Sequence, residues 1–185
     1  MLTVSALGHR TFLRRLVGAA MLDAATYEDI EADRTATRQA LAVVLLSSVS
    51  AGLGAQGLGR RGLLAVVFFS AVALMAWAAW SLVTYEIGVR ILPGTHTRAD
   101  VGELLRTIGF ATAPGILRIL GLVPGLGVPV FAISAVWMLA AMIVAVRQAL
   151  DFTSTRRAVA VCCLGWLFAI GFAVLFGVFF GPRVH

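Results

Sequence analysis

Two residues with chemical consequences lie close together in one apolar stretch of this sequence. Residues 104–123, LLRTIGFATAPGILRILGLV, contain Pro114 near the middle and Arg118 about one turn later. In lipid, a proline leaves a backbone carbonyl without its hydrogen bond, and a guanidinium must reach water or an anion. A broken, charged segment of this kind is typical of a site for an ion or a substrate.

A second interpretation of Arg118 needs no substrate. The residue is about five positions, or roughly 7–8 Å, short of the end of the stretch, and an arginine side chain can extend that far. No apolar segment of the chain offers a carboxylate at this level to pair with the guanidinium. We expect Arg118 to reach the membrane interface or a lipid phosphate, because an isolated buried charge is costly.

Two pairs of opposite charges stand four residues apart, the spacing of neighbours on a helix. Glu86 precedes Arg90, the favourable order, and Arg147 precedes Asp151. Glu86 could serve as a proton or cation site in a membrane helix. We favour an ion pair that anchors the end of the helix, because Glu86 has a partner and lies near the end of its apolar segment.

The sequence shows no catalytic or cofactor-binding constellation. It contains no H-E-x-x-H, no G-x-S-x-G, no pair of intramembrane aspartates and no phosphate-binding loop. His9, His96 and His185 are far apart, and Cys162 and Cys163 are adjacent thiols without a histidine cluster. We expect no enzyme activity, no cofactor and no metal, and we expect the cysteines to pack in the core.

The elements that position these residues are membrane helices. The chain is 60% hydrophobic and 13% charged, whereas charged residues make up about a quarter of a soluble domain. Windows long enough to cross the hydrocarbon core, which is about 30 Å thick, recur along it. The sequence predicts an all-α polytopic bundle of five transmembrane helices preceded by an N-terminal amphipathic interfacial helix. The five spans are about 39–57, 62–86, 104–123, 128–146 and 158–180.

The arginines give the expected orientation. There is no lysine among the 15 basic residues, which we attribute to codon composition. With the N-terminus inside, Arg60, Arg61, Arg118 and Arg183 lie toward the outer side and the other 11 toward the cytoplasm. We therefore expect a cytoplasmic N-terminus and an outer C-terminus. The net charge of +6 then favours contact with anionic lipid head groups. No segment of the sequence resembles a nucleic-acid-binding motif.

Residues 1–37 form the expected cytoplasmic segment, and residues 38–182 the membrane domain. In HRTFLRRLVGAAMLDAA, apolar residues share one helical face and arginines the other, which favours a helix in the head-group plane. The alternative is a helix packed under the bundle by the same apolar face. The acidic TYEDIEAD that follows favours a solvated turn, and the other interpretation is a docking site for a partner. Asp33 is placed to cap the N-terminus of the first span.

Prolines and small residues predict how the spans pack. LVPGLGVPV, with proline at both ends and glycine inside, predicts a tight hairpin between the third and fourth spans. Ser47, Ala51 and Gly54 in the first span, and Gly177 and Gly181 in the last, let helix backbones approach closely. Such faces allow a helix to pack against another helix of the same chain, against a protein partner or against a second copy in a homo-oligomer.

Residues from about 85 to 167 resemble the Yip family, the Ypt/Rab-interacting five-span membrane proteins, and especially its bacterial branch. GFATAP, with Gly109, Phe110 and Pro114, is similar to the family's G-Y-x-x-x-P. LVPGLG, Trp137 and AVRQALDFTSTRRAVAV follow in the family's order, and TYEIGVRILPG is also similar. The resemblance implies a polytopic protein with a cytoplasmic N-terminal region. In eukaryotic members it implies Rab binding, but their D-L-Y-G-P element is absent here.

Two classes of function follow from these observations. The first is a non-enzymatic protein of a bacterial plasma membrane that organises protein partners or lipids. The second is a small transporter or channel built on the third span that Pro114 breaks. The transporter needs polar groups from several spans to converge near the middle of the membrane, and the sequence offers few.

Overall fold

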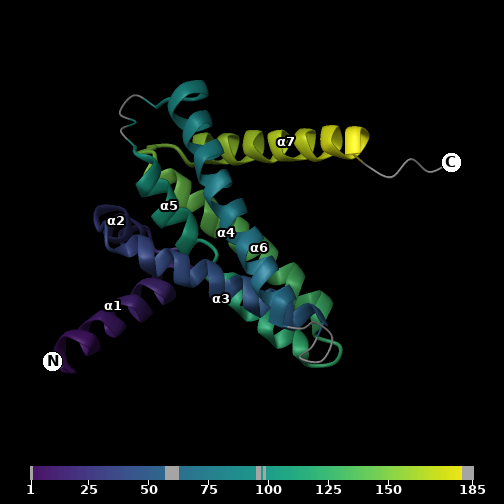
Figure 1. Cartoon of the computed structure of the whole chain (residues 1–185). Helices are drawn as coiled ribbons and strands as arrows, with labels where there is room; N and C mark the ends of the chain where they lie inside the picture. Colours follow the sequence, from purple (N-terminus) through teal and green to yellow (C-terminus); the bar gives the residue numbers. More distant parts are fainter. Residues whose placement is uncertain (1, 57–62, 95–96, 98, 181–185) are drawn as a thin grey trace.

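The computed structural model describes residues 2–56, 63–94, 97 and 99–180, and this part of the chain contains helices and no strands. Two helices, α1 (Leu2–Ala20) and α2 (Ala24–Ala32), form an N-terminal hairpin. The elements that follow are listed in chain order: α3 (Ala36–Gln56), α4 (Leu63–Glu86), the π-helix η1 (Ile87–Ile91), α5 (Val101–Phe110), the 3₁₀-helix η2 (Ala113–Leu122), α6 (Gly127–Ala149) and α7 (Thr155–Phe180). Figure 1 shows α3, α4 and α6 running along one bundle.

Four helical segments of the described chain are long and apolar enough to cross a membrane. They are Ala36–Ala55, Ser70–Ile91, Val101–Leu122 and Gly127–Ala149. These segments correspond to the first four expected spans. The fifth, expected at 158–180, falls within α7, which leaves the bundle and projects away from it (Figure 1).

The third span is built from two kinds of helix. The α-helix α5 ends at Phe110, and the 3₁₀-helix η2 begins at Ala113. Pro114 therefore occupies the first turn of η2, where a missing N–H breaks no helical hydrogen bond. Ten α-helical residues span about 15 Å and ten 3₁₀ residues about 20 Å, so the two pieces together cover a bilayer core.

Glycines on one side of η2 bring it against α3. A Cβ atom added at Gly115 would lie 2.1 Å from the Ser47 hydroxyl, and one at Gly121 would lie 2.6 Å from the Gly54 carbonyl oxygen. Ser47 and Gly54 are seven residues apart, which is two α-helical turns and about 10.5 Å of rise. The close approach expected at these two residues is thus confirmed, within the chain.

The helix type of η2 follows from the same contacts. Gly115 and Gly121 are six residues apart, which is two turns of a 3₁₀-helix and about 12 Å of rise, so both face α3. In an α-helix, with 3.6 residues per turn, positions six apart would point in different directions. The backbone of Arg118, midway between them, also faces α3, since a Cβ at Gly54 would lie 1.8 Å from its carbonyl oxygen.

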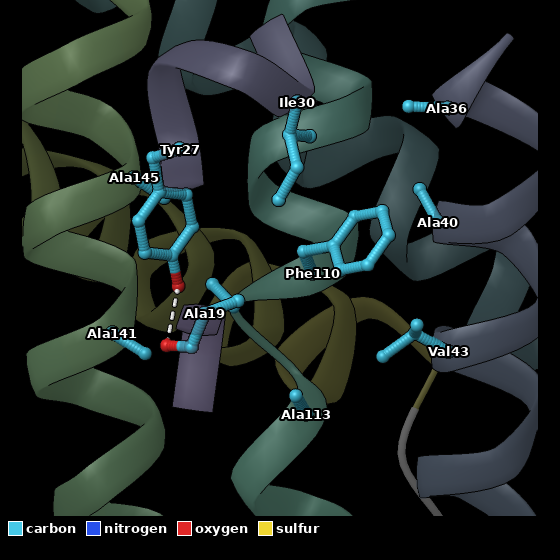
Figure 2. Close-up of a cluster of buried hydrophobic side chains, with 11 residues drawn as sticks. Ala19, Tyr27, Ile30, Ala36, Ala40, Val43, Phe110, Ala113, Ala141 and Ala145 are labelled. Atoms are coloured by element: carbon cyan, nitrogen blue, oxygen red, sulfur yellow. Dashed lines mark hydrogen bonds between the residues drawn. The ribbon is translucent and has the colours of Figure 1, made fainter. Parts of the chain in front are cut away.

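The N-terminal hairpin closes one core of the molecule. Tyr27 and Ile30 of α2 are fully buried with Phe110 and with alanines of α1, α3 and α6 (Figure 2). The Tyr27 hydroxyl donates a hydrogen bond of 3.2 Å to the Ala19 carbonyl. A second core joins α5, α7, η1 and the end of α6.

Helix α1 divides its apolar face between the protein and the surroundings. Phe12 and Leu16 pack against the first core, whereas Leu13, Val17 and Met21 are exposed by 55%, 60% and 69%. The packing of α1 on the bundle is the alternative that the sequence left open. Placement of the exposed stripe in a head-group plane stays a prediction.

Arg15 departs from the expected polar face of α1. Its side chain is 5% exposed, against 72% for Arg14. Arg15 donates to Asp29 at 2.9 Å, Asp33 at 2.8 Å and Gln39 at 3.2 Å. The placement of Arg15 with the solvated arginines was wrong, because Asp29 of α2 and Asp33 at the end of α2 compensate its burial.

Candidate functional site

An open cleft of about 410 Å³ lies where α2, α5 and the α6–α7 turn meet. Its acidic lining comes from three elements: Glu28 and Glu31 of α2, Glu103 of α5 and Asp151 beyond the end of α6. Its other lining residues are Ala32, Arg147, Gln148, Phe152 and Thr153. The cleft thus holds four carboxylates and one guanidinium, a net negative surface.

Hydrogen bonds between elements hold α2 at the edge of this cleft. The Gln148 amide donates to Glu28 at 2.9 Å, and the buried Arg106 guanidinium donates to the backbone carbonyl of Glu31. Deeper in the bundle, the Trp137 indole donates to the Ala20 carbonyl at 2.6 Å. The turn between α1 and α2 is therefore fastened to a membrane helix as well as packed on it.

Local sequence places Glu103 at the start of α5. Asp100 caps the helix by accepting the Glu103 N–H at 2.9 Å, and the Glu103 carboxylate accepts the Asp100 N–H at 2.8 Å. This capping box satisfies two amides that the helix itself leaves without partners. It also fixes a carboxylate at the cleft.

The pKa of Glu31 is raised to about 7. Burial is the largest cause, and the carboxylates of Glu103 and Asp151 add to it. The positive charge of Arg106 acts in the opposite direction. Glu31 therefore changes charge near neutral pH, unlike an ordinary glutamate.

The Arg15 cluster beside the cleft has the opposite electrostatics. Hydrogen bonding from Arg15 is the largest cause of the lowered pKa of Asp29. The pKa of Asp33 is also lowered, first by Thr35, which donates through its hydroxyl, and then by Arg15. These carboxylates stay ionised, so the base of the hairpin carries fixed ion pairs.

The two expected charge pairs have different outcomes. Glu86 and Arg90 form an ion pair of 2.9 Å between exposed side chains. Arg147 and Asp151 form none: Arg147 donates instead to the Phe152 carbonyl at 3.3 Å. The expected pairing was wrong because α6 ends at Ala149 and Asp151 adopts a φ of 50°, so helical i,i+4 geometry does not reach it.

The remaining site residues expected from sequence lie in the third span. Gly109, Phe110 and Pro114 are buried, and a Cβ at Gly109 would lie 2.7 Å from that of Ala40. Arg118 is half-buried, and its side chain crosses to α6 instead of running along the span. Of the expected residues, Gly109, Phe110 and Pro114 thus pack inside the bundle. Arg147 and Asp151 line the cleft.

Sequence reasoning missed Glu28, Glu31 and Glu103 as members of one site. The prediction of a solvated turn for the acidic run was wrong, because these residues form α2, which buries Tyr27 and Ile30. Glu103 belongs to no motif that marks a site in the sequence. The available signal was that an acidic run, the start of the third span and the end of the fourth all lie at one end of a bundle. Among the residues that the structure describes, no group of histidine, cysteine or carboxylate side chains is arranged to hold a metal ion.

Comparison with known proteins agrees with the helical layout. The sequence model of the Yip1 domain family matches residues 22–176 of this chain. The matched residues include α2, all four candidate spans and most of α7. No curated protein matches the chain, and no solved structure does. The chain belongs to the Yip1 domain family and is a membrane protein.

Proposed function

We propose that this chain is a non-enzymatic, five-span protein of a bacterial plasma membrane that organises protein partners. Its N-terminus and the acidic cleft lie in the cytoplasm, and its C-terminus lies outside. The excess of arginines toward the cytoplasmic side and the family membership support this arrangement. The second candidate, a transporter built on the broken third span, is disfavoured by the packing of that span.

The observation that carries the proposal is the close contact between η2 and α3. The break after Phe110 is followed by buried Pro114 and Gly115, and a Cβ at Gly115 would meet Ser47 at 2.1 Å and Met138 at 2.9 Å. Discontinuous helices in transporters leave backbone groups free to bind a substrate. Here neighbouring helices occupy the space beside the break, so its packing supports a structural role.

The acidic cleft is the surface that we assign to a partner. A net negative cleft of about 410 Å³ fits a segment rich in arginine or lysine, because guanidinium and ammonium groups pair with carboxylates. The small residues of α3 are occupied within the chain, so they do not support a homo-oligomer through that face. Gly177 and Gly181 lie outside the residues whose side chains are described.

The exposed stripe of α1 suits a bilayer surface beside this cleft. Leu13 and Val17 of α1, and Met21 directly after its end, recur every four residues, and the exposed Arg14 lies next to this stripe. Apolar side chains flanked by arginine bind anionic head groups and the upper acyl chains. We propose that α1 contacts the cytoplasmic leaflet in this way.

Photo-crosslinking from the cleft tests the partner proposal. A photoreactive amino acid replaces the exposed Thr153 in the cleft, or Val136 on the apolar surface of α6 as a control. The matched variant carries Glu28→Gln, Glu103→Gln and Asp151→Asn together. Glutamine preserves the capping box, and asparagine tolerates a positive φ, so the variant removes charge and preserves geometry.

We expect a protein adduct at the cleft position that is absent at the control position and lost in the neutralised variant. Mapping of the adduct should identify a basic segment in the partner. An adduct of equal yield in the neutralised variant would contradict recognition by charge. Lipid adducts alone at both positions would contradict a partner at the cleft.

A further inference from the structure

The guanidinium of Arg118 is held in place by two residues of α6. Its Nε donates to the Ser134 hydroxyl at 3.0 Å, and its Cζ lies 5.3 Å from the centre of the Phe131 ring, a cation–π distance. Ser134 is fully buried and donates in turn to the Phe131 carbonyl at 3.2 Å. The orientation of the charged group is therefore fixed by the protein.

The two terminal nitrogens of Arg118 have no hydrogen-bond partner among the described residues, where its side chain donates through Nε. The buried side-chain nitrogens without a partner in this part of the chain are Trp80 Nε1 and Arg106 Nε. The terminal nitrogens of Arg118 are not buried in this way, although the residue as a whole is half-buried. The two terminal nitrogens carry four N–H donors, which are thus left for a partner outside the described residues.

The surroundings supply no negative charge to this group. Arg118 is the sole charged residue of the sequence between Arg106 and Arg147. None of the ion pairs found in the described ranges includes it. Leu117 and Leu120 of η2 and Ile133 of α6 are exposed beside it, so the nearby surface is apolar. A cation in such a place needs an anion from outside the protein.

The depth of Arg118 suits the phosphate of a phospholipid. Arg118 lies four residues before the end of η2, about 8 Å at the 3₁₀ rise. Ser134 lies seven residues after the start of α6, about 10 Å at the α-helical rise. Arginine at such a depth draws phosphate and water inward by local thinning of the bilayer.

We propose that Arg118 binds the phosphate of a phospholipid from the leaflet at the η2–α6 end of the bundle. Ser134 and Phe131 position the guanidinium, and the two terminal nitrogens form a bidentate contact with phosphate oxygens. The acyl chains lie over the exposed leucines of η2. The inference rests on the membrane placement in the proposed function and is independent of a partner at the cleft.

Thermal stability of the delipidated chain in detergent, with added ligand, tests the proposal. The probes are a phosphatidylglycerol, the diacylglycerol with the same acyl chains, and inorganic phosphate. We expect phosphatidylglycerol to stabilise the wild type and the other two probes to have little effect. In Arg118→Met, which retains the apolar stem, the half-saturating concentration of phosphatidylglycerol should rise about 10- to 100-fold, as for loss of a charge-assisted contact. Arg90→Met, at the other end of the bundle, is the matched control.

Each other outcome overturns a stated part of the proposal. Equal lipid affinity of Arg118→Met and the wild type would refute the site. Equal stabilisation by inorganic phosphate would show a free-anion site instead of a lipid site. If Arg118→Met does not fold, Ser134→Ala and Arg118→Lys provide the comparison, and affinities unchanged in both would refute it. If phosphatidylglycerol does not stabilise the wild type while the cleft adduct still forms, this inference alone is refuted and the proposed function stands.

Discussion

Substitution of Gly54 by alanine tests the packing on which the third span depends. The added Cβ would lie 1.8 Å from the backbone oxygen of Arg118, whereas ordinary van der Waals contact begins at 3.4 Å. Helix η2 must therefore move by about 1.6 Å, the difference between these two distances. Because the clash is with backbone and not with a flexible side chain, we expect a cost at the upper end of overpacking, about 3 kcal/mol.

The matched control lies two residues away on the same helix. A Cβ at Gly52 meets nothing within 4 Å, and alanine is the better helix former, so Gly52→Ala should leave stability unchanged or raise it. Purified proteins in detergent are heated and the remaining folded fraction is measured by size-exclusion chromatography. For a chain of this size, Gly54→Ala should lower the midpoint by roughly 6–12 °C. Equal midpoints for the two variants would refute the close approach of η2 and α3.

Three further predictions concern the N-terminal hairpin. Trp137→Phe removes the donor to the Ala20 carbonyl and should cost about 1 kcal/mol, seen as faster proteolysis of the hairpin while the rest of the chain stays resistant. Arg15→Met should lower the free energy of unfolding by about 2–3 kcal/mol and Arg14→Met by less than about 1, and equal melting midpoints would contradict the burial of Arg15. The pKa of Glu31 is raised from 4.5 to about 7, so its contribution to stability is full below pH 4.5 and is lost as the pH rises to about 7. The melting midpoint of Glu31→Gln should therefore vary less between pH 5 and pH 8 than that of the wild type. Equal variation of the two midpoints would contradict this.

The first four spans and the hairpin between the third and fourth were predictable because they depend on short-range sequence. An uncharged window of about 20 residues has few alternatives to a membrane helix. The turn at residues 123–126 follows from proline and from Gly125, whose φ of +85° is unfavourable for other residues. These features require no knowledge of which helices are neighbours.

The 3₁₀ form of η2 depends on its neighbour and so was not predicted. The 3₁₀ pitch that aligns Gly115 and Gly121 allows close packing only because Ser47 and Gly54 lie opposite them. These contacts join residues more than 60 positions apart in the sequence. The burial of Arg15 has the same origin, since its partners follow it by 14 to 24 positions. Helical periodicity alone assigns an arginine to the polar face.

The cleft was missed for a related reason. Its carboxylates come from three elements, and each looks ordinary in its own stretch of sequence: Glu31 in an acidic run, Glu103 in a capping box and Asp151 after a helix end. Their proximity, and the raised pKa of Glu31, arise once α2 docks on the bundle. The charge of the site is a property of the assembled fold.

The central claim is that the broken third span packs the bundle and does not conduct. The most direct test is flux into proteoliposomes that contain the purified chain, measured for protons, chloride and phosphate against protein-free liposomes and an Arg118→Ala control. We predict no flux above that of protein-free liposomes for either protein. Flux through the wild type that is lost in Arg118→Ala would contradict the claim and establish a transport path at the third span.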